Sequence, residues 1–138
     1  MRIVLARHGE TPWNAEGRYQ GQEDIALSPV GIAQATALGE RLREVRIDRA
    51  VASPLSRARR TAELALGDAR APMLSLDAGL MEIGHGEWEG LLASEIGARD
   101  PARLAAWREA HPEHAVRLRV TYDPLWLPRF WMAMWGIR

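Results

Sequence analysis

Short apolar runs alternate with amphipathic stretches along most of the chain, and this pattern predicts strands that alternate with helices. Three runs are rich in apolar residues and bounded by polar or glycine-containing segments: Ile3–Ala6, Ala50–Ala52 and Met73–Leu76. Runs of this length are typical of strands. Because Ile3–Ala6 is uninterrupted by polar residues, we expect it to be a strand buried on both faces of a sheet.

Apolar residues at helical spacing predict helices between these strands. The clearest covers Pro29–Val45, where Ser28 offers an N-cap hydroxyl and proline occupies the first helical position. A second covers Leu55–Leu66 and is expected to end at Gly67. Two further helices are expected at Leu91–Gly97 and Pro101–Ala110. This alternation favours an α/β fold with a largely parallel sheet.

A polar, glycine-containing segment follows the first expected strand. It runs over Thr11–Leu27, and we expect it to be a long loop. Long loops inside compact domains are usually functional. Ligands of open α/β sheets also bind beyond the carboxyl ends of the strands, which is where this loop would begin.

The composition excludes several classes of chemistry. The 138 residues are most simply one domain, and the proportions of apolar (47%) and charged (26%) residues are typical of a globular protein. With 18 basic and 18 acidic residues the net charge is zero, which argues against a nucleic-acid partner. All the basic residues are arginine and there is no cysteine. Schiff-base chemistry, Walker-type phosphate binding, cysteine metal sites and thiolate phosphatases are therefore excluded.

Nothing in the sequence predicts a membrane partner. The first apolar run is too short for a signal-peptide core, and no stretch reaches the about 18 apolar residues of a membrane span. We therefore expect a cytoplasmic protein.

The segment Val120–Arg138 differs in composition from the rest of the chain, because it holds three of the six tryptophans and the only phenylalanine. One interpretation is a segment that packs on the core. A membrane-surface anchor would need a basic face, and only Arg129 and Arg138 are available for one. The third interpretation is an altered reading frame.

Polar side chains follow each of the three expected strands. They are Arg7, His8, Gly9, Glu10, Thr11 and Asn14 after the first strand, Ser53 and Arg57 after the second, and Glu82 after the third. Because the carboxyl ends of parallel strands meet at one edge of a sheet, we expect these groups to lie close together.

This collection of side chains suits the chemistry of phosphate esters. Arginine binds phosphoryl oxygens through two parallel hydrogen bonds, and Arg57 near a helix start would add backbone N–H donors. A neutral imidazole such as His8 is a competent nucleophile toward phosphorus, and neighbouring arginine charges should lower its pKa. Glu82 is placed to protonate the leaving alkoxide. Each residue alone would more simply have a structural role or lie on the surface, so only their joint placement favours catalysis.

Four segments of the chain, in order, resemble the histidine phosphatase superfamily, also called the phosphoglycerate mutase-like family. They are Arg7–Asn14 (Arg-His-Gly-Glu-Thr-Pro-Trp-Asn), Gln20–Ala35, Ser53–Ala62 and Leu80–Gly90. The resemblance covers about residues 1 to 92 and implies a three-layer α/β/α fold with a mostly parallel sheet.

The resemblance also implies roles for individual residues. His8 would be the nucleophile that becomes phosphohistidine, and Glu82 would be the proton donor. Phosphate or substrate would be bound by Arg7, Thr11, Asn14, Gln20, Gly21 and Arg57. His85 would belong to the pocket wall. No metal and no cofactor is implied, and the partner would be a small-molecule phosphate ester.

The chain departs from the family downstream of Glu82. Relatives carry a second histidine in a Thr-His-Gly-like segment, and Val120–Arg138 contains no histidine. We expect residues 1–118 to be the N-terminal portion of a histidine phosphatase domain and residues 119–138 to be an atypical Trp-rich tail. The hypothesis is that the chain is truncated, by a frameshift that replaced the C-terminal portion typical of the family.

Three functions are compatible with the sequence. The first is a phosphomonoesterase that acts through a phosphohistidine on a small phosphorylated metabolite. The second is a mutase, although such mutases usually carry a Glu-Arg-His-Tyr-like stretch where this chain has Glu82-Ile83-Gly84-His85. The third is a catalytically impaired fragment that only binds phosphorylated ligands. The sequence names no substrate, and it leaves a homodimer through the apolar tail open.

Overall fold

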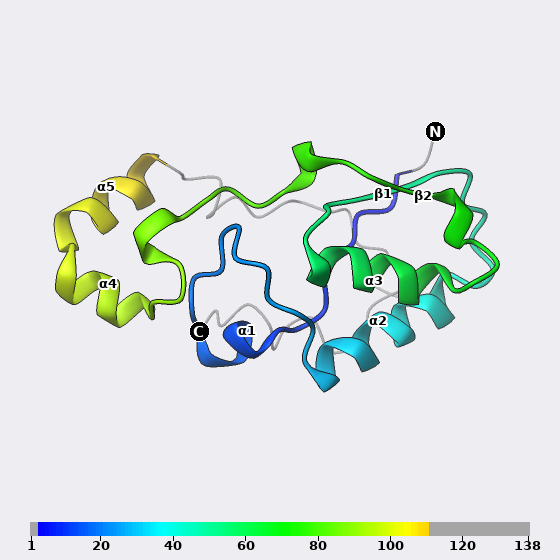
Figure 1. Cartoon of the computed structure of the whole chain (residues 1–138), viewed down its shortest axis with the longest axis horizontal. Coiled ribbons are helices and arrows are strands. Elements are labelled where there is room, and N and C mark those ends of the chain that lie inside the picture. The colour runs from blue at the N-terminus through cyan, green and yellow to red at the C-terminus, as the bar shows by residue number, and fades with distance from the viewer. Residues whose placement is uncertain (1–2, 111–138) are drawn as a thin grey trace. The chain divides into compact units, whose positions relative to one another are not determined.

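A computed structural model describes residues 3–110 of the chain (Figure 1). The chain divides into two compact units, Met1–Arg99 and Asp100–Arg138. Nearly all described elements belong to the first unit, and only α5 (Pro101–Ala110) belongs to the second. The expected Trp-rich tail, with its interpretations as a packed segment, an anchor or an altered reading frame, lies outside the described residues.

The first unit contains a βαβ unit. Strand β1 (Ala50–Ala52) and strand β2 (Leu74–Leu76) run parallel, with Ala50 opposite Leu74 and Ala52 opposite Leu76. The connecting helix α3 (Ser56–Leu66) packs on both strands (Figure 1). The predictions of these two strands, of the intervening helix and of an α/β fold with parallel strands are confirmed.

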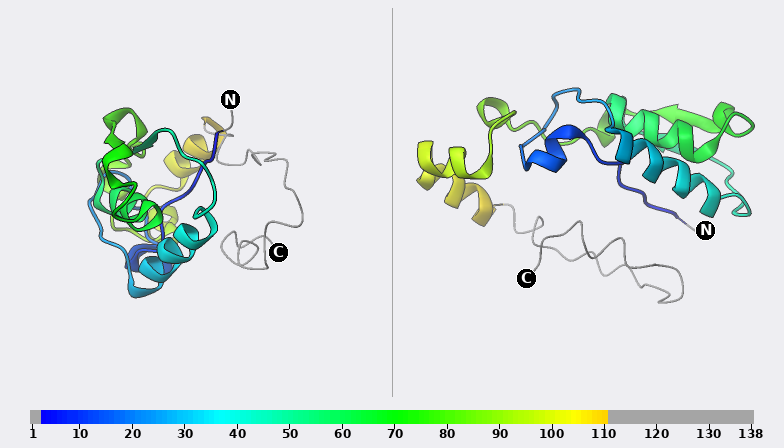
Figure 2. Two further views of the ribbon diagram at one scale, coloured as in Figure 1. Left: turned by 90° about the vertical axis from the view of Figure 1, so that its right-hand side faces the viewer. Right: turned by 90° about the horizontal axis from the view of Figure 1, so that it is seen from below.

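Helix α2 (Pro29–Arg41) lies beside α3, as the front view (Figure 1) and the view from below (Figure 2) both show. The two helices approach closely because the facing residues are small. Ala35 and Ala65 are buried, and a Cβ at Gly39 would lie 3.0 Å from the carbonyl oxygen of Leu64. This close packing fixes α3, which carries Arg57, relative to the start of α2.

Side-chain hydrogen bonds mark both ends of α2. As predicted, the Ser28 hydroxyl accepts the N–H of Gly31 at the start of α2. At the other end α2 stops at Arg41, four residues before the expected Val45. Beyond it, the carbonyl of Leu42 accepts both the guanidinium of Arg70 at 2.7 Å and the N–H of Val45 at 3.1 Å, so the chain continues as a turn that a side chain holds.

The prediction that Ile3–Ala6 forms a strand buried on both faces is wrong for the described chain. The segment is extended but pairs with no strand, and Ile3, Val4 and Leu5 are 68%, 53% and 77% exposed. A doubly buried strand needs strands beside it and helices over both faces. Within the described residues the only strand pair is β1 with β2, so this apolar run has no sheet to complete.

The expected long loop at Thr11–Leu27 contains a short helix that the polar composition concealed. Helix α1 (Pro12–Glu16) begins with a capping box between Thr11 and Asn14, has proline at its first position, and ends at Gly17 with φ of 76°. Beyond it, the backbone pairs with a distant segment. The Tyr19 N–H donates to the Leu91 carbonyl at 3.0 Å.

Three single turns of 3₁₀-helix and a short α-helix complete the first unit. The turns are η1 (Ala71–Met73), η2 (Ala78–Leu80) and η3 (Gly86–Trp88), and the helix is α4 (Ala93–Arg99). The expected helices near 91–97 and at 101–110 are therefore confirmed. Among residues 3–110, no helix is long and apolar enough to cross a membrane.

Candidate active site

The loop that carries His8 is fixed by α2 and α3 through its backbone. The Gly9 N–H donates to the Thr61 hydroxyl at 2.9 Å, and that hydroxyl donates to the Arg57 carbonyl at 2.7 Å. Gly9 also touches the start of α2, since a Cβ there would lie 2.4 Å from the carbonyl oxygen of Gly31. Only glycine allows this close approach. The loop is therefore fixed at Gly9, the residue next to His8.

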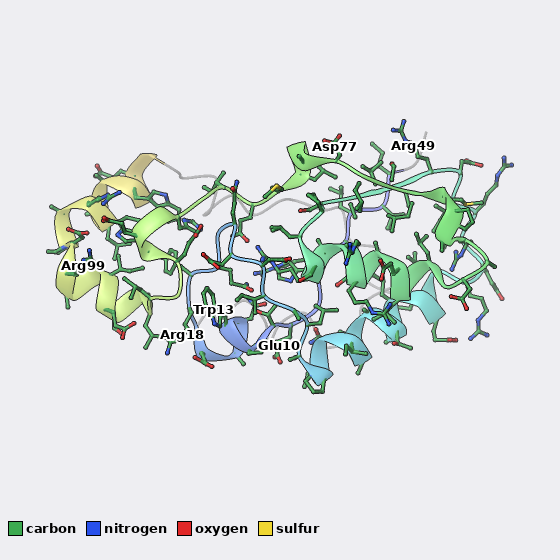
Figure 3. The ribbon with its side chains drawn as sticks, in the orientation of Figure 1. Glu10, Trp13, Arg18, Arg49, Asp77 and Arg99 are labelled. Atoms are coloured by element: carbon green, nitrogen blue, oxygen red, sulfur yellow. The ribbon has the colours of Figure 1, made fainter. Side chains whose placement is uncertain are left out.

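Glu10 also binds the start of α2 and is labelled in Figure 3. Its carbonyl accepts the N–H of Ser28 at 2.9 Å, and its carboxylate accepts the Ser28 hydroxyl at 2.8 Å. Its own N–H donates to the side-chain oxygen of Gln34 at 2.9 Å. The segment after His8 is thus anchored by both backbone and side chain.

The hydrogen bond of the His8 ring selects one tautomer. Nδ1 lies 2.7 Å from the carbonyl oxygen of Gly9. Since a carbonyl oxygen can only accept, the proton of the neutral ring resides on Nδ1 and the lone pair on Nε2. The ring is half-buried by its surroundings. The geometry therefore presents Nε2 as the nucleophilic atom.

Burial is the main reason that the pKa of His8 lies below its usual value. The hydrogen bond to Gly9 and the charge of Glu82 oppose this effect, while the charges of Arg57 and Arg7 add to it. Burial and the two cations prevail because each disfavours the positively charged, protonated form of the ring. His8 is consequently neutral, and able to donate its lone pair, at pH 7.

Arg57, the second residue of α3, has a side chain that is only 1% exposed. Its guanidinium donates from Nη1 to the Glu23 carbonyl and from Nη2 to the Gly21 carbonyl, each at 2.7 Å. Nη2 also lies 3.1 Å from Oε2 of Glu82. The structure thus brings Arg57, Gly21 and Glu82 together, and gives Arg57 a structural role besides its expected one toward phosphate.

Glu82 lies between two cationic or polar side chains at the edge of the site. Its carboxylate contacts Arg57 on one oxygen, and its other oxygen lies 3.8 Å from Nε2 of His85. The carboxylate is still 42% exposed, so it can be reached by solvent or by a ligand. The His85 side chain is buried, with its ring edge-on to Tyr19 at 5.1 Å. The expected role of His85 as a pocket wall stays a prediction.

Thr11, Asn14 and Gln20 form a cluster of their own. The Thr11 hydroxyl donates to Oε1 of Gln20 at 2.6 Å and accepts the N–H of Asn14 at 3.1 Å. Thr11 is fully buried and Gln20 nearly so. These bonds fix the turn into α1, and the phosphate-binding roles expected for the three residues stay predictions.

Arg7 differs from Arg57 in its exposure. It lies on the extended N-terminal segment with its side chain exposed to solvent, and its charge reaches His8. Its role in binding phosphate also stays a prediction.

Three further residues support the site, and the sequence reasoning assigned a role to none of them. Thr61 links the His8 loop to α3, as described above. The Asp24 carboxylate accepts the Ser56 N–H at 2.6 Å and so caps α3 next to Arg57. Glu89 accepts the N–H groups of two loops. All three occur in the segments that resemble the family, so the only signal was their place in those motifs.

A nucleophilic imidazole, a buried guanidinium and an accessible carboxyl group form a set suited to phosphoryl transfer. The imidazole supplies a lone pair, the guanidinium stabilises anionic oxygens, and the carboxyl group moves a proton. Within residues 3–110, no three histidine, aspartate or glutamate side chains are arranged to hold a metal ion.

Two relatives and one solved structure show what the chain is similar to. It is 40% identical over 110 residues to the probable phosphoglycerate mutase GpmB of Erwinia tasmaniensis, covering 80% of this chain and 49% of the relative. It is 42% identical over 108 residues to the glucosyl-3-phosphoglycerate phosphatase of Mycolicibacterium vanbaalenii, covering 78% and 48%. The structure of a mycobacterial glucosyl-3-phosphoglycerate phosphatase in complex with VO3 matches with a TM-score of 0.67 and 38% identity, covering 74% and 50%.

The chain spans about half the length of each of these proteins. The match to the solved structure confirms the phosphoglycerate mutase-like α/β fold over the shared half. The sequence pattern of the Histidine phosphatase superfamily (branch 1) matches residues 3–121, which is most of the chain. The chain belongs to the histidine phosphatase superfamily.

Proposed function

We propose that this chain carries the nucleophile half of a phosphomonoesterase that acts through a phosphohistidine on a small phosphorylated metabolite. The observation that carries the proposal is the His8 ring, whose hydrogen bond to Gly9 places the lone pair on Nε2. Its lowered pKa and the nearby charges of Arg57 and Glu82 support the same role. A location in the cytoplasm belongs to this proposal.

The first step transfers the phosphoryl group to His8. Nε2 attacks phosphorus and forms an N–P bond while the P–O bond to the substrate alcohol breaks. Glu82, in its carboxylic acid form, gives its proton to the departing alkoxide. Arg7 and Arg57 stabilise the equatorial oxygens, where negative charge is spread in the transition state.

The second step returns the enzyme to its starting state. The Glu82 carboxylate takes a proton from water as the water oxygen attacks phosphorus. The N–P bond breaks, inorganic phosphate leaves, and both His8 and protonated Glu82 are restored. One water is consumed for each ester bond cleaved.

The match to a solved phosphatase that holds VO3 supports the phosphate half of this proposal. Vanadium oxyanions resemble phosphate in charge and shape, so such a ligand marks a phosphoryl site in that protein. The similarity to glucosyl-3-phosphoglycerate phosphatases favours a small phosphorylated organic acid or sugar derivative as the substrate class. Phosphate esters of this size are the partner that we propose.

A mutase is the second candidate, and the similarity to a probable phosphoglycerate mutase favours it. A mutase would return the phosphoryl group from His8 to another hydroxyl of the substrate instead of to water. The stretch Glu82-Ile83-Gly84-His85 differs from the one typical of such mutases, so the phosphatase is the stronger proposal.

Trapping of the phosphoenzyme tests the proposal directly. The full chain is mixed with a ³²P-labelled phosphate monoester and quenched, and acid-labile label on protein is counted. We expect label in the wild type and in His114→Ala, and none in His8→Ala. Release of inorganic phosphate identifies a phosphatase, whereas isomerised phosphoglycerate identifies a mutase. Label that survives in His8→Ala would contradict the proposal.

A further inference from the structure

The carboxylate of Glu89 lies where two loops of the site meet. Its Oε1 accepts the backbone N–H of Gln22 at 2.9 Å and that of His85 at 3.0 Å. These two amides are more than sixty residues apart in sequence. A single side chain therefore joins the loop after α1 to the loop that carries Glu82.

The approach of the two loops is close enough to require glycine. Gly21 has φ of 53°, and a Cβ there would lie 2.0 Å from Oε1 of Glu89 and 2.9 Å from the backbone nitrogen of His85. The Gly21 turn is therefore shaped around this carboxylate. A longer or differently placed acceptor at position 89 would not fit the same space.

Both loops joined by Glu89 also bind the Arg57–Glu82 pair. The loop after α1 gives its Gly21 carbonyl to Arg57 at 2.7 Å. The other loop gives the Glu82 carboxylate to Arg57 at 3.1 Å and the Glu82 carbonyl to Nε2 of Gln22 at 3.1 Å. The contacts form a closed ring. It runs from Glu89 through the backbone of Gly21 and Gln22 to Arg57, on to Glu82, and back through His85.

We infer that Glu89 is a positioning residue, whose carboxylate holds the two loops together and thereby keeps Glu82 against Arg57. It acts through backbone amides and touches no reacting atom in this arrangement. The consequence for the reaction, protonation of the leaving group by Glu82, rests on the proposed function. The joining of the two loops by Glu89 does not depend on the proposed function.

The protonation state of Glu89 agrees with this geometry. Partial burial works to raise its pKa, but the amide hydrogen bonds from Gln22 and His85 and the charge of His85 outweigh it. The pKa of Glu89 consequently lies below its usual value, so the carboxylate form that accepts both amides persists at neutral pH.

The first test reads the loops themselves and needs no enzymatic activity. Amide hydrogen exchange of Gln22 and His85 is measured by NMR in the full-length wild type, Glu89→Ala and Glu89→Gln. We expect exchange at both amides to rise roughly tenfold or more in Glu89→Ala. Glu89→Gln keeps one acceptor oxygen and should recover part of the protection. It also serves as the test variant if the alanine variant does not fold.

The matched control is Glu87→Ala, which removes a carboxylate from the same turn. Glu87 is exposed, and its carboxylate lies 3.8 Å from Arg99 rather than in the ring of contacts. We expect wild-type exchange at both amides in this control. Nuclear Overhauser contacts between the side chains of Arg57 and Glu82 should be kept in it and lost in Glu89→Ala. Unchanged exchange in Glu89→Ala, or equal effects in both variants, would overturn the inference.

The second test separates positioning from general stability. Turnover of phenyl phosphate, whose leaving group needs a proton, is compared with that of nitrophenyl phosphate, whose leaving group scarcely does. We expect Glu89→Ala to lower kcat roughly tenfold for the first ester, with kcat for the second and both KM values nearly unchanged. Equal losses on both esters would contradict the positioning role. If the wild type cleaves neither ester and forms no phosphohistidine, the proposed function fails, and the exchange result still decides whether Glu89 joins the loops.

Discussion

Nη2 of Arg57 lies 3.1 Å from Oε2 of Glu82, so the candidate phosphate ligand and the candidate proton donor contact each other directly. The guanidinium is buried and already donates to two backbone carbonyls. A dianionic phosphoryl group that enters the site must therefore compete with Glu82 for the same donor. This arrangement ties substrate binding to the position of the acid, because both depend on Arg57.

Replacing Arg57 should weaken both binding and the fold around the site. We expect Arg57→Ala to lower the affinity for vanadate by about 1.5–3 kcal/mol, since it removes a charge-assisted donor. It should also lower Tm, because the carbonyls of Gly21 and Glu23 lose their partner. Calorimetric titration and thermal melting measure the two effects. Arg60→Ala is the control, as Arg60 is exposed and pairs with Glu63; a matching loss there would count against Arg57 as a ligand.

Replacing Glu82 should affect esters according to their leaving groups. If Glu82 gives its proton to the alkoxide, Glu82→Gln slows phenyl phosphate cleavage by roughly 10²–10⁴. Nitrophenyl phosphate should be slowed far less, because its leaving group is stable as an anion. Steady-state rates with both esters provide the measurement, with Glu87→Gln as the control. A uniform loss on both would point to a binding role.

The neutral form of His8 should persist below pH 6.5, because its pKa is lowered by burial and by the arginine charges. On the acidic side, phosphoryl transfer should therefore fall as the pH drops through this lowered pKa, where protonation removes the lone pair. Arg7→Gln removes one of the charges and should raise the pKa of His8. Titration of the His8 ring by NMR measures this, with Arg46→Gln, an exposed partner of Asp48, as the control. No difference between the two variants would contradict an electrostatic role for Arg7.

The same shift predicts how stability depends on pH. The folded pKa of His8 lies below its unfolded value, so the unfolded chain binds more protons once the pH falls below about 6.5. This contribution to stability is complete above pH 6.5 and is lost as the pH falls toward the folded pKa. His8→Gln should flatten this part of the curve of unfolding free energy against pH, measured by urea denaturation. An unchanged slope would mean that His8 is solvated in the folded protein.

The Thr61 hydroxyl should be needed for the conformation of the His8 loop. Thr61→Val keeps the shape of the side chain but leaves the Gly9 N–H without its acceptor and removes the hydroxyl bond to the Arg57 carbonyl. We expect a loss of about 1–3 kcal/mol in the free energy of unfolding, because the buried N–H of Gly9 is left without an acceptor. Thr36→Val is the matched control, because the Thr36 hydroxyl donates to the Ile32 carbonyl at an exposed position. Equal effects of the two substitutions in denaturant titrations would argue against the link through Thr61.

Local sequence signals determined most of the helices of this protein. Ser28 and the following proline begin α2, and Gly67 ends α3, as their intrinsic conformational preferences dictate. The order of apolar runs likewise determined β1, β2 and the α/β class. These features depend on neighbouring residues, so they can be predicted without knowing the rest of the fold.

Long-range contacts decided the rest. The apolar run at Ile3–Ala6 has strand-forming residues, yet a strand exists only where another backbone accepts and donates its hydrogen bonds, and none does so in the described chain. The site depends on pairs far apart in sequence, such as Arg57 with Glu82 and Gly9 with Thr61. Residue types alone suggested a candidate nucleophile, a candidate phosphate-binding arginine and a candidate acid. Only the tertiary structure decided that Thr61 and Glu89 hold them, because a hydroxyl or carboxylate acquires such a role from the backbone that folds against it.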